Sequence, residues 1–263
     1  MKMFLRMTVV GFSAVTMAAW AGELPMPPGT IGQLVEGRTG RKTVTNVLKV
    51  GDSLNLRGRG LTALPADALT QTQIEALYLD GNLFAAPPRG LEVFTNLRRL
   101  TLNQCPLVTL EGLPALPRLE TLSAWDNRIE TLGRDMSGLA SLRVLNLQGN
   151  RLKTLPPAIG SLVHLELLLL DDNHLTTLPE EIGALARLRR LSLTGNALTT
   201  LPAAIARLGL LESLDLSGNH LTALPVALDN CRALKLLKLT GNTISRADKN
   251  RFRRALPGCL VVD

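Results

Sequence analysis

Leucine returns along most of this chain at a fixed interval. In each interval a short segment alternates leucine with other residues, as at Leu145 and Leu147, and an asparagine follows a few positions later. Consecutive asparagines stand 23 residues apart through five steps, at Asn127, Asn150, Asn173, Asn196, Asn219 and Asn242. Going backwards, Cys105 stands 22 residues before the first of them, and Asn82 and Arg59 follow at steps of 23. Such a period predicts a solenoid in which each unit buries its leucines against its neighbours.

The alternation within each unit predicts a short β-strand. Leu145 and Leu147 should point into the core, whereas Val144, Asn146 and Gln148 should point outward. The asparagine that follows should use its amide to satisfy buried backbone groups. A proline after a later leucine has no N–H, so the return path should be extended or a short helical turn. The predicted fold class is an α/β-type solenoid. It is a curved stack with a short parallel β-sheet on the concave face and short helical or extended returns on the convex face.

The two ends of the repeat region have different patterns. About nine units occupy residues 51–242, and residues 243–263 are predicted to form a C-terminal cap. In that cap Ser245 and Asp248 form a capping box for a short helix, and Leu260–Val262 should be a last strand. Residues 22–50 are predicted to be an N-terminal segment and cap, with a strand within residues 43–50.

The first 21 residues predict a signal peptide. Two basic residues, Lys2 and Arg6, precede an uncharged run, and Ala19-Trp20-Ala21 is a small-residue cleavage signal. The run is too short for a stable membrane anchor, so no membrane span is expected after cleavage. An uncleaved anchor is the alternative. The predicted location is outside the cytoplasm, either periplasmic or secreted, in a bacterium.

The unit is plainest in LRVLNLQGNRLKTLPPAIGSLVH, residues 142–164. Over residues 51–263 this pattern resembles the leucine-rich-repeat family, and its Leu-Pro pairs resemble the 23-residue LPxxI(G)xL subclass. The pairs are Leu64-Pro65, Leu155-Pro156, Leu178-Pro179, Leu201-Pro202 and Leu224-Pro225. That subclass occurs in Ras-pathway scaffolds, Scribble-type polarity proteins and many bacterial proteins. The resemblance implies the fold but gives almost no information about the partner.

Charge is uneven along the chain. Residues 22–60 carry six Lys or Arg against three Asp or Glu, residues 243–263 carry five against two, and residues 61–242 carry 16 against 17. A nucleic-acid-binding protein needs a stripe of basic residues along its contact face, and the repeats have no such stripe. The predicted partner is a protein that binds to the concave face. The chain itself is predicted to be a monomer. The alternative is an envelope structural protein whose basic ends contact anionic lipid or polysaccharide.

No cofactor, metal site or catalytic arrangement is predicted. His174 and His220 follow repeat asparagines two units apart, which separates their backbones by about 9 to 10 Å, and His164 lies on the return path. This spacing argues against a shared metal and against a Ser-His-Asp arrangement. Residues 37–43, GRTGRKT, lack the spacing of a phosphate-binding loop. The chain is therefore predicted to be non-enzymatic.

Three cysteines follow the signal segment. Cys105 replaces a repeat asparagine, Cys231 takes a core leucine position, and Cys259 precedes the last strand. Buried thiols are the first interpretation. Export would also permit a bridge between Cys231 and Cys259.

The second position of each strand motif alternates in charge sign through eight units. The residues are Glu75, Arg98, Glu120, Arg143, Glu166, Arg189, Glu212 and Lys235. On neighbouring parallel strands these side chains are lateral neighbours, so opposite charges should meet along the stack. Each exposed pair contributes about 0 to 1 kcal/mol, so this ladder is interpreted as structural.

Aromatic residues make up 3% of the chain, and this scarcity makes two of them informative. Tyr78 and Trp125 fall on outward positions of the concave side, as do Val144, Leu167 and Leu169. Exposed apolar clusters with Tyr or Trp anchors are typical of interaction sites, so these five residues are the predicted partner-binding patch. The unit that contains Trp125 has an alanine in place of an inward leucine. The alternative is that the indole folds back into the space beside that alanine.

Overall fold

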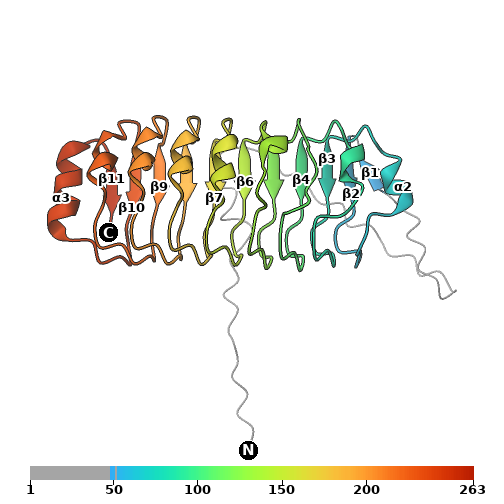
Figure 1. Ribbon diagram of the computed structural model, residues 1–263, viewed down its shortest axis with the longest axis horizontal. Helices are drawn as coiled ribbons and strands as arrows, with labels where there is room; N and C mark the ends of the chain where they lie inside the picture. Colours follow the sequence, from blue (N-terminus) through green and yellow to red (C-terminus); the bar gives the residue numbers. More distant parts are fainter. Residues whose placement is uncertain (1–47, 51) are drawn as a thin grey trace, which may run out of the picture. The chain divides into compact units, whose positions relative to one another are not determined.

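The computed structural model describes residues 48–50 and 52–263, all within one unit that spans residues 44–263. In this part of the chain eleven strands form one sheet in sequence order (Figure 1). They are β1 (Leu48–Val50), β2 (Ser53–Asn55), β3 (Ala76–Tyr78), β4 (Arg99–Thr101), β5 (Thr121–Ser123), β6 (Val144–Asn146), β7 (Leu167–Leu169), β8 (Arg190–Ser192), β9 (Ser213–Asp215), β10 (Leu236–Lys238) and β11 (Leu260–Val262). β1 runs antiparallel to β2, and every later strand runs parallel to the one before it. The predicted solenoid with a parallel sheet is confirmed.

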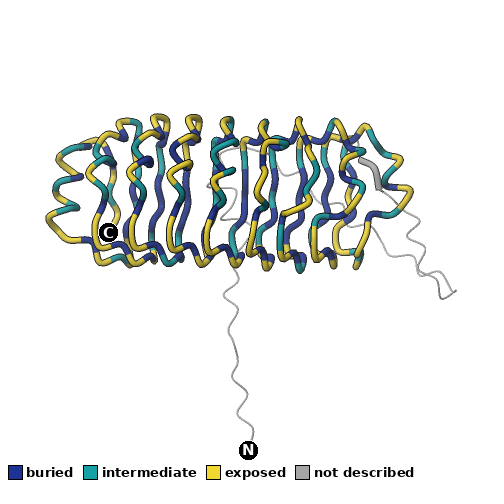
Figure 2. The backbone as a smooth tube through the Cα atoms, in the orientation of Figure 1, coloured by how far each residue is buried: buried dark blue, intermediate teal, exposed yellow. Residues whose placement is uncertain are grey.

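The central leucine of each strand from β2 to β10 fixes the stack. Each one is the register partner of its counterpart in the next unit, and each is at most 1% exposed. These residues are Leu54, Leu77, Leu100, Leu122, Leu145, Leu168, Leu191, Leu214 and Leu237. Leu100 still pairs with Leu122 although that step is one residue shorter, so the deletion is absorbed in the return path. Figure 2 shows the buried segments repeating from unit to unit. No unit could bury these leucines alone, so stability comes from stacking.

The return path contains short helices. They are α2 (Ala66–Leu69), η1 (Leu91–Val93), η2 (Ser137–Leu139), η3 (Pro157–Ser161), η4 (Glu180–Ala184), η5 (Ala203–Arg207) and η6 (Val226–Asn230), followed by the terminal helix α3 (Arg246–Ala255). The five-residue 3-10 helices η3 to η6 each begin after the proline of a Leu-Pro pair, which has an extended backbone such as φ −69° and ψ 151° at Pro156. Their close spacing requires small residues, because a Cβ on Gly183 would lie 2.6 Å from the Ala204 carbonyl oxygen. The predicted helical returns are therefore present.

The repeat asparagines connect successive units. The Asn150 Nδ2 donates to the carbonyl oxygens of Ala124 and Leu147 at 2.9 Å, and its Oδ1 accepts from the Ile129 N–H at 2.9 Å. These backbone groups are buried and would otherwise have no partner from the strands. Cys105 keeps only a weak version of this role, because its Sγ lies 3.6 Å from the Leu79 carbonyl oxygen and has no amide to offer.

The C-terminal end is covered by α3, as predicted. The Asp248 N–H donates to the Ser245 Oγ at 3.0 Å, which is the expected cap of the helix. Phe252 is fully buried against the last unit. Arg251 donates to the Leu224 carbonyl oxygen at 2.9 Å and so ties the helix to the repeat body.

Several predictions concern other residues. The signal segment 1–21, the basic loop 37–43 and most of the N-terminal segment lie outside the described residues. Among the helices of residues 48–50 and 52–263, none is long and apolar enough to cross a membrane.

Candidate functional site

The outer sheet face is the surface formed by the first, third and fifth residues counted from the start of each strand, on the side opposite the buried leucines. Along β7 these residues are Leu167, Leu169 and Asp171. Because parallel neighbours stand side by side at about 4.8 Å, each position forms a row that runs across all units. This face corresponds to the surface predicted to be concave.

The predicted charge ladder borders this face. The printed sequence gives seven lateral pairs, and five of them are ion pairs in the structure. Arg98 contacts both Glu75 and Glu120, Arg143 lies 2.7 Å from Glu166, Glu212 lies 2.5 Å from Arg189, and Lys235 lies 2.7 Å from Glu212. The hydrogen bonds from Lys235 and Arg189 lower the pKa of Glu212. The side chains are 30% to 73% exposed, so each pair stabilises the fold only slightly.

A second set of contacts on the outer sheet face was not predicted. The Asp171 Oδ1 accepts from the Ser192 hydroxyl, and from the Thr194 N–H at 2.8 Å. Asp80 makes the same two contacts with Thr101 and with the N–H of Asn103. Asn103 repeats the pattern with Ser123, at 2.7 Å, and the Trp125 N–H, at 3.0 Å. The signal was present as an Asp or Asn at the fifth position and a Ser or Thr at the third position of the next unit.

Tyr78 is on the outer sheet face but offers little surface. It is 9% exposed, and the Arg57 guanidinium lies 4.2 Å from the centre of its ring. Arg57 is in turn held by an ion pair with Asp80 at 2.5 Å. The prediction of Tyr78 as an accessible binding anchor therefore needs correction, since its neighbours cover the ring.

The other four predicted patch residues are partly exposed, and they fall in two places. Val144 is the register partner of Leu167, and Leu169 lies two residues further along the same strand. Trp125 lies two residues beyond β5, where the lateral neighbour on the next unit is Gln148. The indole is half-buried and is not one of the fully buried core side chains.

Three carboxylates lie at the C-terminal ends of these strands. Asp126, Asp171 and Asp172 are close enough to repel one another: burial raises the pKa of Asp172, and the charges of Asp171 and Asp126 raise it further. Asp126 and Asp172 have a left-handed backbone with φ of 53°, at a position where six other units have glycine. Sequence analysis did not single out these residues.

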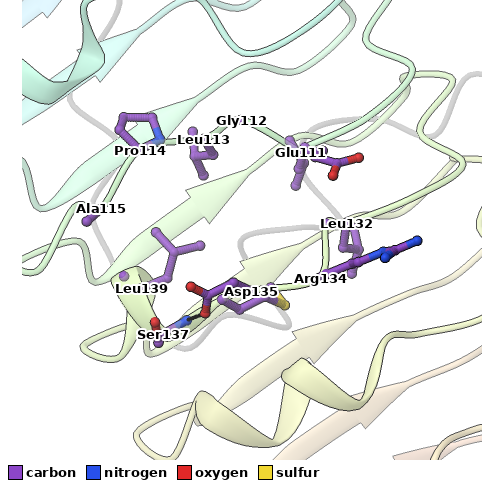
Figure 3. Close-up of a pocket in the computed structure, with 14 residues that line it drawn as sticks. Glu111, Gly112, Leu113, Pro114, Ala115, Leu132, Arg134, Asp135, Ser137 and Leu139 are labelled. Carbon is purple, nitrogen blue, oxygen red and sulfur yellow. Dashed lines mark hydrogen bonds between the residues drawn. The ribbon is translucent and has the colours of Figure 1, made fainter.

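An open cavity of about 390 Å³ lies on the return side in the irregular units (Figure 3). It lies between residues 110–115 and 132–139, where the Leu-Pro pair is missing and the first segment has no helix. Gly138 lies against Ala115 so closely that a Cβ would be 2.7 Å from the Ala115 Cα. The lining contains no His or Cys, and the Asp135 carboxylate accepts from the Ser137 N–H at 2.8 Å. Nothing in this lining resembles a nucleophile with its base.

The remaining candidate residues stay apart. The three thiols are free and buried, so the structure contains no bridge between Cys231 and Cys259. Burial raises the pKa of Cys231 to about 11. His174 and His220 are exposed on separate units. Within residues 48–50 and 52–263, no group of three or more His, Cys, Asp or Glu side chains could hold a metal ion.

Comparison with known proteins agrees with this geometry. The family model described as "Leucine rich repeat" matches residues 117–175, 163–221 and 186–244. The leucine-rich repeat domain of the type III effector XopL is similar, with a TM-score of 0.69 and 25% identity, over 80% of this chain and 75% of that chain. The ectodomain of the receptor kinase GASSHO1/SCHENGEN3 from Arabidopsis thaliana, solved in complex with CASPARIAN STRIP INTEGRITY FACTOR 2, has a TM-score of 0.62 and 30% identity. That match covers 73% of this chain and 24% of the ectodomain. No curated protein sequence matches this chain significantly.

Proposed function

Because this chain is a leucine-rich-repeat protein, we propose that it is a non-enzymatic interaction module that binds a protein partner on its outer sheet face. The observation that carries the proposal is the apolar group Val144, Leu167 and Leu169. In the two units that follow, the same rows hold polar residues, Arg190 with Ser192 and Ser213 with Asp215. Partly exposed aliphatic side chains that are flanked by polar residues in the neighbouring units favour a contact site.

A similar solved structure supports the proposal by analogy. The Arabidopsis ectodomain carries a bound partner in its structure, as its description states. The shared fold offers the same kind of extended, rigid sheet face. We also propose that the chain is exported, as a bacterial protein of the periplasm or medium, on the basis of residues 1–21. N-terminal sequencing of the purified protein would test this, since cleavage should leave Gly22 as the first residue.

A matched pair of substitutions tests the binding face. Leu167→Arg places a charge on the outer sheet face, at a row where Arg99 and Arg190 already occur. Val163→Arg makes the same kind of change on the return side, where Val163 is 45% exposed. Partners retained by the full chain from an envelope extract should be lost with Leu167→Arg and kept with Val163→Arg. Equal retention by both variants would contradict the proposal.

The alternative is an envelope structural role through basic ends. Arg246 and Arg254 are exposed on α3, which is the observation that favours it. Binding of this kind would depend on charge and should be released by high salt, because screening weakens contacts between exposed charges. A complex on the apolar part of the outer sheet face should survive the same salt concentration.

A further inference from the structure

Because all repeat units share one register, each residue on the outer sheet face can be compared with the residue at the same position in the other units. Along β7, Leu167 and Leu169 face outward, and the next outward residue is Asp171, followed by Asp172. Val144 extends the apolar part onto β6. Along this strand the apolar side chains are therefore followed directly by carboxylates. We use the name β7 strip for the residues Leu167, Leu169, Asp171 and Asp172, together with Val144 and Asp126 from the two preceding units.

The carboxylates of the strip differ in burial and in their hydrogen bonds and ion pairs. Asp171 is buried and hydrogen-bonded to Gln148, Ser192 and the Thr194 N–H. Asp126 and Asp172 are exposed. Among residues 52–263, no Lys or Arg forms an ion pair with either of these two side chains. The strip thus presents negative charge that the described part of the protein leaves uncompensated.

The position of the two exposed carboxylates is unusual for this chain. Asp126 and Asp172 have the left-handed backbone that the equivalent glycines have in six other units. Those glycines are Gly58, Gly81, Gly149, Gly195, Gly218 and Gly241. Aspartate is tolerated there, but glycine has the lower backbone cost. The Asp126 side chain extends over Gly149, where an added Cβ would lie 2.3 Å from its Oδ1. The neighbouring glycine therefore gives the carboxylate room on the surface.

Building on the proposed function, we infer that the β7 strip binds an extended protein segment that carries an aliphatic side chain and, two to four residues further on, a lysine or arginine. The aliphatic side chain would cover Leu167 and Leu169. Asp172 lies five residues beyond Leu167, roughly 16 Å at the rise of a strand, which is the reach of such a segment. The basic group would pair with Asp172, whose Oδ1 lies over Gly195, while Asp126, two units back, adds negative charge to the same face. Neither carboxylate forms an ion pair within residues 52–263.

The experiment uses a display library of random twelve-residue peptides selected on the full chain. We expect the selected peptides to be enriched in Lys or Arg together with Leu, Ile or Val. The double variant Asp126→Gly/Asp172→Gly should weaken the best peptide about 10-fold, as expected for the loss of an exposed ion pair and of a second negative charge near it. This variant should fold at least as well as the parent, since it restores the residue that six units already use. Leu167→Ser/Leu169→Ser should weaken the same peptide.

A control separates specific contacts from net charge. Glu92→Gln/Glu181→Gln removes two exposed carboxylates from the return-side helices η1 and η4 and should leave peptide affinity unchanged. Peptides that need Leu167 and Leu169 but ignore Asp126 and Asp172 would overturn the inference and leave the proposed function standing. Peptides unaffected by either outer-face variant, or the absence of any enrichment, would overturn the inference and count against the proposed function as well.

Discussion

At the scale of single residues, position in the repeat decides what a polar side chain does. Asp215 is the last residue of β9 and Asp172 lies three residues beyond β7, and their environments act in opposite directions. Burial alone would raise the pKa of Asp215, but hydrogen bonds from Ser217 and the Lys238 ion pair lower it overall. Asp172 has only burial and like charges around it, so its pKa is raised. The first carboxylate stabilises the fold when ionised, and the second destabilises it.

The pKa of Asp172 gives a test with a defined sign. A raised pKa in the folded state means that ionisation costs folding free energy above that pKa, and the cost disappears below the unfolded value of 3.8. Asp172→Asn keeps the shape and tolerates the left-handed backbone. It should therefore raise the melting temperature at pH 7, and the gain should vanish near pH 3. A gain of the same size at both pH values would contradict the electrostatic cause.

At the scale of elements, the charge ladder forms ion pairs between most neighbouring repeat units along the sheet. Arg143 and Glu166 make the 2.7 Å pair between β6 and β7, whereas the pairs Glu120–Arg143 and Glu166–Arg189 are not in contact. The ladder therefore consists of two groups of three residues, Glu75–Arg98–Glu120 and Arg189–Glu212–Lys235, with the single pair Arg143–Glu166 between them. Its effect on stability should depend on which pair is changed.

Reversal of one charge tests this arrangement. Glu166→Lys places three positive side chains in a row, at positions 143, 166 and 189, and removes the Arg143 pair. The free energy of unfolding should fall by about 0.5 to 1 kcal/mol in low salt and by less in high salt. Urea denaturation at two salt concentrations measures this. Glu120→Lys should show a similar loss through Arg98. Stability independent of salt in both variants would mean that the ladder does not act electrostatically.

Particular elements show how far the sequence determines the fold. The 23-residue spacing predicted the strands, their register and the returns after Leu-Pro, because each follows from a local pattern repeated many times. The terminal helix was predicted from the single capping box of Ser245 and Asp248. The candidate site was predicted less well. Tyr78 occupies an outward row, but the sequence did not reveal that Arg57, one unit away, would cover it. Asp126 and Asp172 were missed although each replaces the glycine that six other units have at the position before the repeat asparagine. Their repulsion becomes visible only in the stacked units.

At the scale of the whole molecule, a solenoid is stabilised by contacts between neighbouring units, so its ends decide how readily it frays. The C-terminal end depends on Arg251. Its guanidinium donates to the Leu224 carbonyl oxygen and lies 3.4 Å from the Asp229 carboxylate and 3.2 Å from that of Asp248. This one side chain joins α3 to η6 and to the last Leu-Pro unit. Loss of the contact should release the cap before it affects the middle of the stack.

Arg251→Met removes the charge and keeps most of the side-chain volume. Docking of α3 should weaken by about 1 to 3 kcal/mol, the range for hydrogen bonds that involve a charged group. Amide hydrogen exchange should then accelerate over residues 221–263, with little change around Leu145, because opening of the end requires no opening of distant units. Arg254→Met is the matched control, since Arg254 is exposed on the same helix. Uniform acceleration along the whole repeat region would show that the stack opens as one cooperative unit and that α3 is not a separable cap.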